Sequence, residues 1–143
     1  MIVFLDFDGT THRYPCEEGS HFEFLPRIES VLRAFETVQI VIASDWRHYH
    51  ALSALRQHFS ADMRQRVIGV TPSLATLHTQ AYGLRRREAE VFLRERALDV
   101  DAWIALDDYE GNWQPLDRRV IVCANGFYDR EEELLRAALA GTA

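Results

Sequence analysis

The chain has 143 residues, of which 48% are hydrophobic and 27% are charged, and its formal net charge at pH 7 is −6. This length suits one domain with a single three-layer core. Because we find neither an apolar run of membrane-spanning length nor a signal-peptide pattern, we expect a cytoplasmic protein with no membrane partner. The acidic charge argues against a broad grip on a nucleic-acid backbone, although it does not exclude a nucleic-acid end as substrate.

The N-terminal stretch begins with an apolar run, Ile2–Leu5, that is typical of a buried strand. Two carboxylates, Asp6 and Asp8, follow it and are separated by one residue. Side chains alternate along a strand, so both acids are expected to point to the same side. Such a pair suits a divalent cation with a preference for oxygen ligands, above all Mg²⁺. The alternative is an ordinary Asp-x-Asp-Gly turn that closes the strand.

The rest of the chain alternates between strand and helix patterns. We expect helices that begin at Pro26 and that cover 51–59, 71–83, 85–97 and 129–139. Further strands are expected at 38–43, 66–70, 103–106 and 119–123. Residues 11–25 show no clear period and are interpreted either as a flap or as a surface loop. This alternation predicts a single α/β domain over residues 1–143, a three-layer Rossmann-like sandwich around a mostly parallel five-stranded sheet.

Polar residues follow three of the expected strands at the point where each one ends. Asp6 and Asp8 follow the first strand, Ser44 follows the second, and Asp107 and Asp108 follow the fourth. In parallel sheets, ligands bind beyond the carboxyl ends of the strands. Each residue also has a simpler interpretation, since Ser44 could cap a helix and the paired acids could form a turn. Their coincidence at one edge favours a site.

The run Asp6-Phe7-Asp8-Gly9-Thr10 resembles motif I of the haloacid dehalogenase (HAD) superfamily. Ser44 matches the place of motif II, and Asp107-Asp108 resembles the short form of motif IV. The resemblance implies a phosphatase in which Asp6 is the nucleophile and Asp8 the general acid and base. It also implies Mg²⁺ held by Asp6, Asp8 and Asp107, with Asp108 in direct or indirect contact, and a phosphoryl group bound by Ser44.

Motif III departs from the usual pattern, because no Lys lies between the third and fourth expected strands. The run Arg85-Arg86-Arg87 is the only basic run in that region. Arg87 is our choice, since Arg87-Glu88-Ala89-Glu90-Val91 resembles an Arg-x-x-Glu-Ile helix start in a small subgroup that includes HAD domains associated with RNA-repair proteins. The alternative is a solvated helix start.

The two usual insertion points leave no room for a cap domain. HAD relatives without a cap often act on large substrates, so we expect a phosphorylated macromolecule, such as a nucleic-acid end or a protein. Thr10, Trp46 and Arg47 are the expected substrate contacts, with Trp46 stacking on a ring. Two alternatives stay open: a HAD fold that binds phosphate without turnover, and a receiver-type regulatory module, which the absence of an acid after the third strand disfavours.

Overall fold

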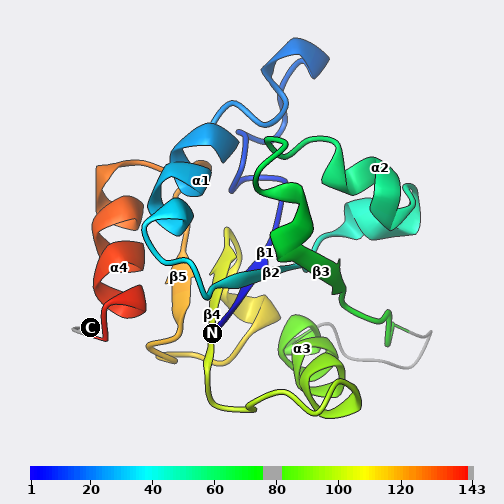
Figure 1. Ribbon diagram of the computed structural model, residues 1–143. Helices are drawn as coiled ribbons and strands as arrows, with labels where there is room; N and C mark the ends of the chain where they lie inside the picture. The colour runs from blue at the N-terminus through cyan, green and yellow to red at the C-terminus, as the bar shows by residue number, and fades with distance from the viewer. Residues whose placement is uncertain (76–81, 142–143) are drawn as a thin grey trace.

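The computed structural model describes residues 1–75 and 82–141 and contains a five-stranded sheet (Figure 1). The strands are β1 (Ile2–Leu5), β2 (Gln39–Ile42), β3 (Val67–Val70), β4 (Trp103–Asp107) and β5 (Val120–Val122). Their order in the sheet is β3-β2-β1-β4-β5, and every neighbouring pair is parallel. The predicted parallel α/β sheet is therefore confirmed, and β1 lies at its centre.

Helices cover both faces of this sheet (Figure 1). On one face lie α1 (Leu25–Arg33), α2 (Leu52–Arg56) and α4 (Asp129–Leu139), and on the other lies α3 (Leu84–Glu95). Short 3-10 helices lie in the segments between the longer elements: η1 (Glu18–Ser20), η2 (Asp45–His48), η3 (Arg64–Arg66) and η4 (Glu110–Asn112). Three layers result, with no cap domain in the described part of the chain.

Strand β1 is apolar at every position because it is covered on both faces. Val3 and Leu5 pack into the core beneath α1, α2 and α4, whereas Ile2 and Phe4 pack beneath α3. The exposure of Val3, Phe4 and Leu5 is 0%. A central strand buried on both faces holds the residue that follows it in a fixed position.

One predicted helix is not found as expected. Residues 71–75 of the helix expected over 71–83 are not helical, and residues 76–81 lie outside the described part of the chain. Gly83, expected to end that helix, instead precedes α3 in a left-handed conformation with φ of 68°. Glycine adopts this conformation without the strain that a side chain would bring. Helix α2 is also shorter than the 51–59 expected for it.

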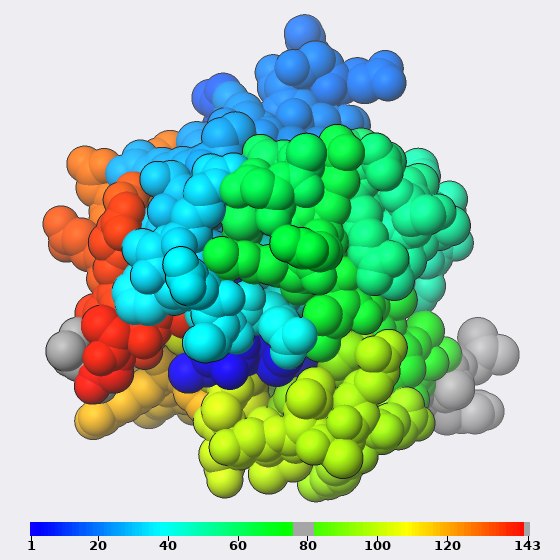
Figure 2. Space-filling model, in the orientation of Figure 1, coloured from blue at the N-terminus to red at the C-terminus, as the bar shows by residue number. Residues whose placement is uncertain are grey.

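Residues 11–25, called the flap, run into the first residue of α1, and the part that contains η1 stands out from the rest of the molecule (Figures 1 and 2). All of these residues are described, and they contribute no strand to the sheet, apart from an isolated bridge between Asp8 and His12. In residues 1–75 and 82–141, every helix is too short or too polar to cross a membrane.

Candidate functional site

Three carboxylates meet at the carboxyl edge of the sheet. Asp6 follows β1 and Asp107 ends β4, and the backbone N–H of Asp6 donates to the carbonyl of Leu106 at 3.0 Å. One oxygen from each of Asp6, Asp107 and Asp108 lies within 4.8 Å of the others. An open hollow of about 240 Å³ lies here, lined by Asp6, Asp8, Tyr14, Asp45, Arg85, Asp108 and Asn112.

Burial makes the charge on two of these acids costly. Asp107 has no exposed surface, and burial raises its pKa to about 6. Two hydrogen bonds oppose this shift: Trp113 Nε1 donates to Oδ2 at 3.0 Å, and the Tyr109 N–H donates to Oδ1 at 2.9 Å. Burial and the neighbouring Asp107 raise the pKa of Asp6 well above its ordinary value. A divalent cation would offset these charges, and an all-oxygen donor set suits Mg²⁺. The residues present therefore fit this ion.

Gly9 allows Asp108 to approach the end of β1. Its φ is 76°, and a Cβ at this position would overlap the carboxylate of Asp108. A side chain here would meet both backbone strain and a steric clash, so the glycine of the motif is required by the packing of the acids.

The Asp8 carboxylate is held by two side chains from different segments. Its Oδ1 lies 2.8 Å from His12 Nε2 and 2.9 Å from Trp46 Nε1. His12 belongs to the 11–25 segment, yet its exposure is 0%. In the sequence, only the spacing of four residues between Asp8 and His12 could have indicated this contact, because no periodic pattern includes His12.

The basic residue beside the acids is Arg85, which corrects the choice of Arg87. Arg85 is buried on α3 and its Nη2 donates to Asp45 Oδ1 at 2.9 Å. Burial opposes its charge, but Asp6 and Asp45 raise the pKa of Arg85 above its ordinary value. Arg85 Nε is buried and makes no hydrogen bond with any described residue. Arg87 is exposed, and its Nη1 donates to the carbonyl of Tyr82 at 2.9 Å.

The side chain of Arg47 makes internal hydrogen bonds, which argue against its expected role as a substrate contact. Its side chain is 4% exposed. It donates to the carbonyls of Thr71 and Ser44 and, through Nη2, to Glu88 Oε2 at 2.8 Å. Glu88 itself has no exposed surface. The pair links η2 to α3, and these internal acceptors already occupy the guanidinium of Arg47.

Thr10 and Ser44 are both buried. The exposure of Thr10 is 0%, so it offers no surface to a substrate, contrary to expectation. Ser44 lies two residues after the end of β2, and its Oγ accepts the N–H of Trp46 at 3.3 Å, which makes it the cap of η2. The Ser44 hydroxyl proton is not used in this bond and remains a donor.

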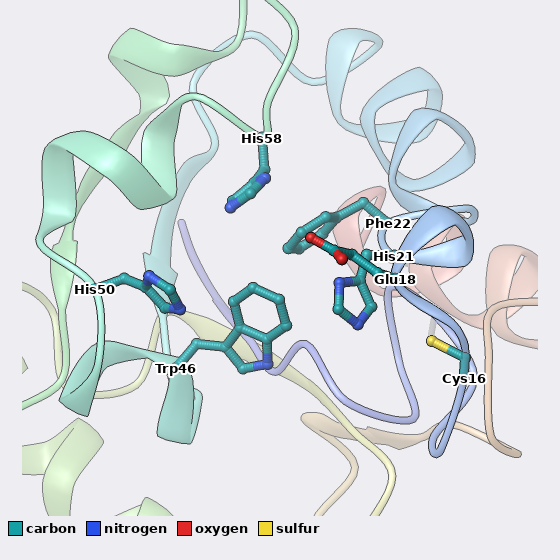
Figure 3. A pocket seen from close by; sticks show the side chains of 7 residues that line it. All are labelled: Cys16, Glu18, His21, Phe22, Trp46, His50 and His58. Carbon is teal, nitrogen blue, oxygen red and sulfur yellow. The ribbon is translucent and has the colours of Figure 1, made fainter.

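A second and larger hollow of about 730 Å³ adjoins Trp46 (Figure 3). Its lining is rich in aromatic and imidazole rings: Cys16, Glu18, His21, Phe22, Trp46, His50 and His58. Figure 3 shows the six-membered ring of Trp46 facing this hollow. Because its indole N–H donates to Asp8, Trp46 connects the hollow to the acid cluster.

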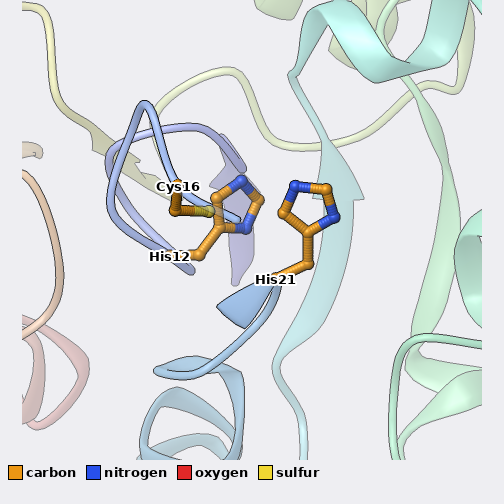
Figure 4. A group of neighbouring side chains, drawn as sticks. All are labelled: His12, Cys16 and His21. Carbon is orange, nitrogen blue, oxygen red and sulfur yellow. The ribbon is translucent and has the colours of Figure 1, made fainter. Parts of the chain in front are cut away.

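A further group of metal-binding side chains lies in the flap (Figure 4). One ligand atom from each of His12, Cys16 and His21 lies within 4.8 Å of the others. Both ring nitrogens of His12 are already in hydrogen bonds, with Asp8 and with the backbone N–H of Phe22. A metal here would have to break one of these bonds, so the trio is not a ready metal site.

Comparison with known proteins gives one match. The model of a family described as "HAD domain in Swiss Army Knife RNA repair proteins" matches residues 2–131, a range that includes both hollows and the acid cluster. No curated protein and no solved structure matches the chain significantly.

Proposed function

The chain belongs to the family of HAD domains found in Swiss Army Knife RNA repair proteins, and from this premise we propose that it is a Mg²⁺-dependent phosphatase. The proposed reaction is hydrolysis of a phosphomonoester through an aspartyl-phosphate on Asp6. One observation carries the proposal: Asp6, Asp8, Asp108 and Arg85 line a single hollow at the carboxyl edge of the sheet.

The metal would be held by the carboxylates of Asp6, Asp107 and Asp108 and by the backbone carbonyl of Asp8. Support comes from the raised pKa values of Asp6 and Asp107, which burial causes in both acids and to which the neighbouring Asp107 adds in Asp6. When bound, Mg²⁺ supplies charge neutralisation for the phosphoryl oxygens and the nucleophile. The remaining chemistry belongs to the side chains.

Two aspartates divide the chemical work in this proposal. Asp6 attacks phosphorus, and its carboxylate forms a bond to the phosphoryl group as the leaving-group oxygen departs. Asp8 donates a proton to that oxygen and then takes one from the water that hydrolyses the aspartyl-phosphate. Asp8 suits this role because it lines the hollow and is partly exposed, whereas Asp6 is 7% exposed.

Arg85 takes the electrostatic role that Lys has in most of the superfamily. Its guanidinium lines the same hollow as Asp6, and its buried Nε makes no hydrogen bond within the described residues. A phosphoryl oxygen would satisfy such a donor. The planar guanidinium forms two-pronged contacts with phosphate, which suits a site without Lys.

The substrate is proposed to be a macromolecular phosphate ester, with a nucleic-acid end first among the candidates. The absence of a cap from the described fold leaves the acid cluster open, so a large substrate would be needed to exclude water. The hollow beside Trp46 offers aromatic surface on which a base could stack. The family's description as RNA repair proteins points the same way.

A substrate panel tests this proposal. Purified protein is assayed with Mg²⁺, and with EDTA as control, on nitrophenyl phosphate, free nucleotides, 3′- and 5′-phosphorylated oligonucleotides and phosphopeptides. We expect Mg²⁺-dependent phosphate release, fastest on an oligonucleotide. Faster turnover of a free metabolite would contradict the macromolecular substrate. Binding of phosphorylated ligands without any turnover would instead indicate a binding module.

A further inference from the structure

The two contacts of Asp8 fall on the same oxygen. His12 Nε2 lies 2.8 Å and Trp46 Nε1 lies 2.9 Å from Asp8 Oδ1. An indole nitrogen can only donate, so the Trp46 contact is an N–H donated to the carboxylate. The direction of the His12 contact depends on which ring nitrogen carries the proton.

The backbone determines that proton's position. The N–H of Phe22 lies 3.2 Å from His12 Nδ1. A backbone N–H can only donate, so Nδ1 must present a lone pair and the ring proton must lie on Nε2. The same neutral tautomer then donates its Nε2–H to Asp8. Thr11 Oγ1 also lies 3.3 Å from Nδ1, and its hydroxyl can rotate to donate to that nitrogen, in keeping with the same tautomer. A buried imidazole held by three contacts has little freedom to exchange these roles.

Ring packing fixes the orientation of both donors. The centroid of the His12 ring lies 5.2 Å from that of Phe22 and 5.7 Å from that of Trp46. Phe7 also packs edge-on against Trp46 at 5.7 Å. His12 comes from the turn after β1 and Trp46 from η2, so two independent segments meet at one carboxylate oxygen.

We propose that His12 and Trp46 are positioning residues that reserve Oδ1 of Asp8 as an acceptor and leave Oδ2 as the atom that transfers protons. This inference rests on the proposed function. As Asp6 bonds to phosphorus and the bond from phosphorus to the leaving oxygen breaks, the Oδ2 proton moves to that oxygen. In the second half, water bonds to phosphorus, the bond to Asp6 breaks, and Oδ2 receives a proton from the water.

Leaving-group dependence distinguishes this role from a merely structural one. An alkyl phosphate has a poor leaving group and needs the acid, whereas nitrophenolate departs with little help. Trp46→Phe keeps the ring but removes the N–H, and His12→Ala removes the other donor. We expect each variant to lose at least about 10-fold more kcat on the alkyl ester than on the nitrophenyl ester. His12→Gln, which retains an amide donor, should recover part of this loss.

Tyr49→Ala is the control, because it removes an exposed ring three residues after Trp46 that lines neither hollow and has no contact with Asp8 among the described residues. It should leave the ratio of the two rates unchanged. Equal losses on both esters in the Trp46 and His12 variants, with active wild-type protein, would overturn the positioning role alone. If wild-type protein cleaves neither of these esters nor any phosphorylated oligonucleotide of the substrate panel, the proposed function fails and this inference fails with it.

A second measurement needs no activity and covers the case in which His12→Ala does not fold. The ¹⁵N chemical shifts of the His12 ring in wild-type protein report the tautomer directly. We expect a protonated Nε2 and an unprotonated Nδ1. A protonated Nδ1 would overturn the assignment.

Discussion

Arg85 Nη2 donates to Asp45 Oδ1 at 2.9 Å, and this ion pair holds the guanidinium beside the carboxylate of Asp6. Asp45 is 73% exposed and lies at the rim of the hollow, whereas Arg85 is 10% exposed and lies deeper. The pair therefore joins the start of α3 to η2 at the hollow that Asp6 lines, although α3 lies on the opposite face of the sheet from α1, α2 and α4.

Replacing Arg85 should harm catalysis much more than replacing Arg87. Loss of a preorganised charge beside a transferring phosphoryl group costs about 100-fold to 1,000-fold in kcat, so Arg85→Ala should fall in this range. Arg87→Ala, two residues along the same helix, is the control and should retain most of the activity. Steady-state kinetics with Mg²⁺ check this, and the reverse order of effects would restore Arg87 as the basic residue.

Mg²⁺ should stabilise the protein more at neutral than at acidic pH. The pKa of Asp107 is raised from its ordinary value of 3.8 to about 6. Between these two pH values, Asp107 holds its proton in the folded protein and loses it in the unfolded chain. Metal-free stability should therefore decline as pH rises through about 6. Mg²⁺ needs the ionised carboxylate, so the Mg²⁺-dependent rise in Tm should be small at pH 5 and larger at pH 7, as thermal melts with Mg²⁺ or EDTA would show.

Asp108→Ala tests the same site without disturbing the core, since Asp108 is exposed. It should remove most of the Mg²⁺-dependent rise in Tm, and Asp107→Ala should do the same if it folds. Glu110→Ala, another exposed acid nearby in η4, should not. An unchanged rise in both the Asp107 and Asp108 variants would exclude this metal site.

Asp6→Asn should abolish turnover and at the same time raise the metal-free Tm. The pKa of Asp6 is raised well above its ordinary value by burial and by Asp107, so ionising this carboxyl costs the metal-free fold stability. A neutral isostere removes that cost, and we expect an increase of roughly a few degrees. Thermal melts in EDTA measure it, and a clear decrease would contradict the electrostatic account of the cluster.

Arg47→Met should destabilise the fold rather than weaken substrate binding. It would remove the 2.8 Å partner of the fully buried Glu88, which among the described residues would keep only the 3.4 Å contact with Arg85 Nη1 and the N–H of Leu74. Breaking a buried pair costs up to about 3–5 kcal/mol, so we expect a loss of roughly 10 °C in Tm at most. Arg33→Met, which removes a solvent-exposed pair with Asp62, is the control and should cost about 1 kcal/mol or less. If Arg47→Met raised KM with an unchanged Tm, Arg47 would be a substrate contact after all.

The sequence predicted the sheet and the acid cluster because both follow from local rules. Strand β1 is apolar throughout, and residues that follow parallel strands must share an edge, so Asp6 and Asp107 could be brought together without a structure. The choice between Arg85 and Arg87 could not be made in this way. Successive helical residues are rotated by about 100°, so the choice depends on where α3 begins and which face it buries.

The burial of His12 and of Arg47 could not be predicted from the sequence for a related reason. The contact of His12 with Asp8 depends on a tight turn, in which the N–H of Thr11 donates to the carbonyl of Phe7, and on the return of the flap at Phe22. Arg47 is buried only because Glu88 on a distant helix meets it. Phe22 and Glu88 lie far along the chain from His12 and Arg47, so no local sequence pattern indicates these contacts.

The most direct test of the account is to trap the phosphate on Asp6. Wild-type protein is mixed with Mg²⁺ and its best substrate, quenched in acid during turnover and treated with borohydride, which reduces an acyl phosphate to the alcohol. Peptide mass spectrometry should then find homoserine at position 6 and aspartate at position 8, and no homoserine in a sample quenched with EDTA before substrate. Phosphate release with unmodified Asp6 in every sample would contradict the covalent mechanism.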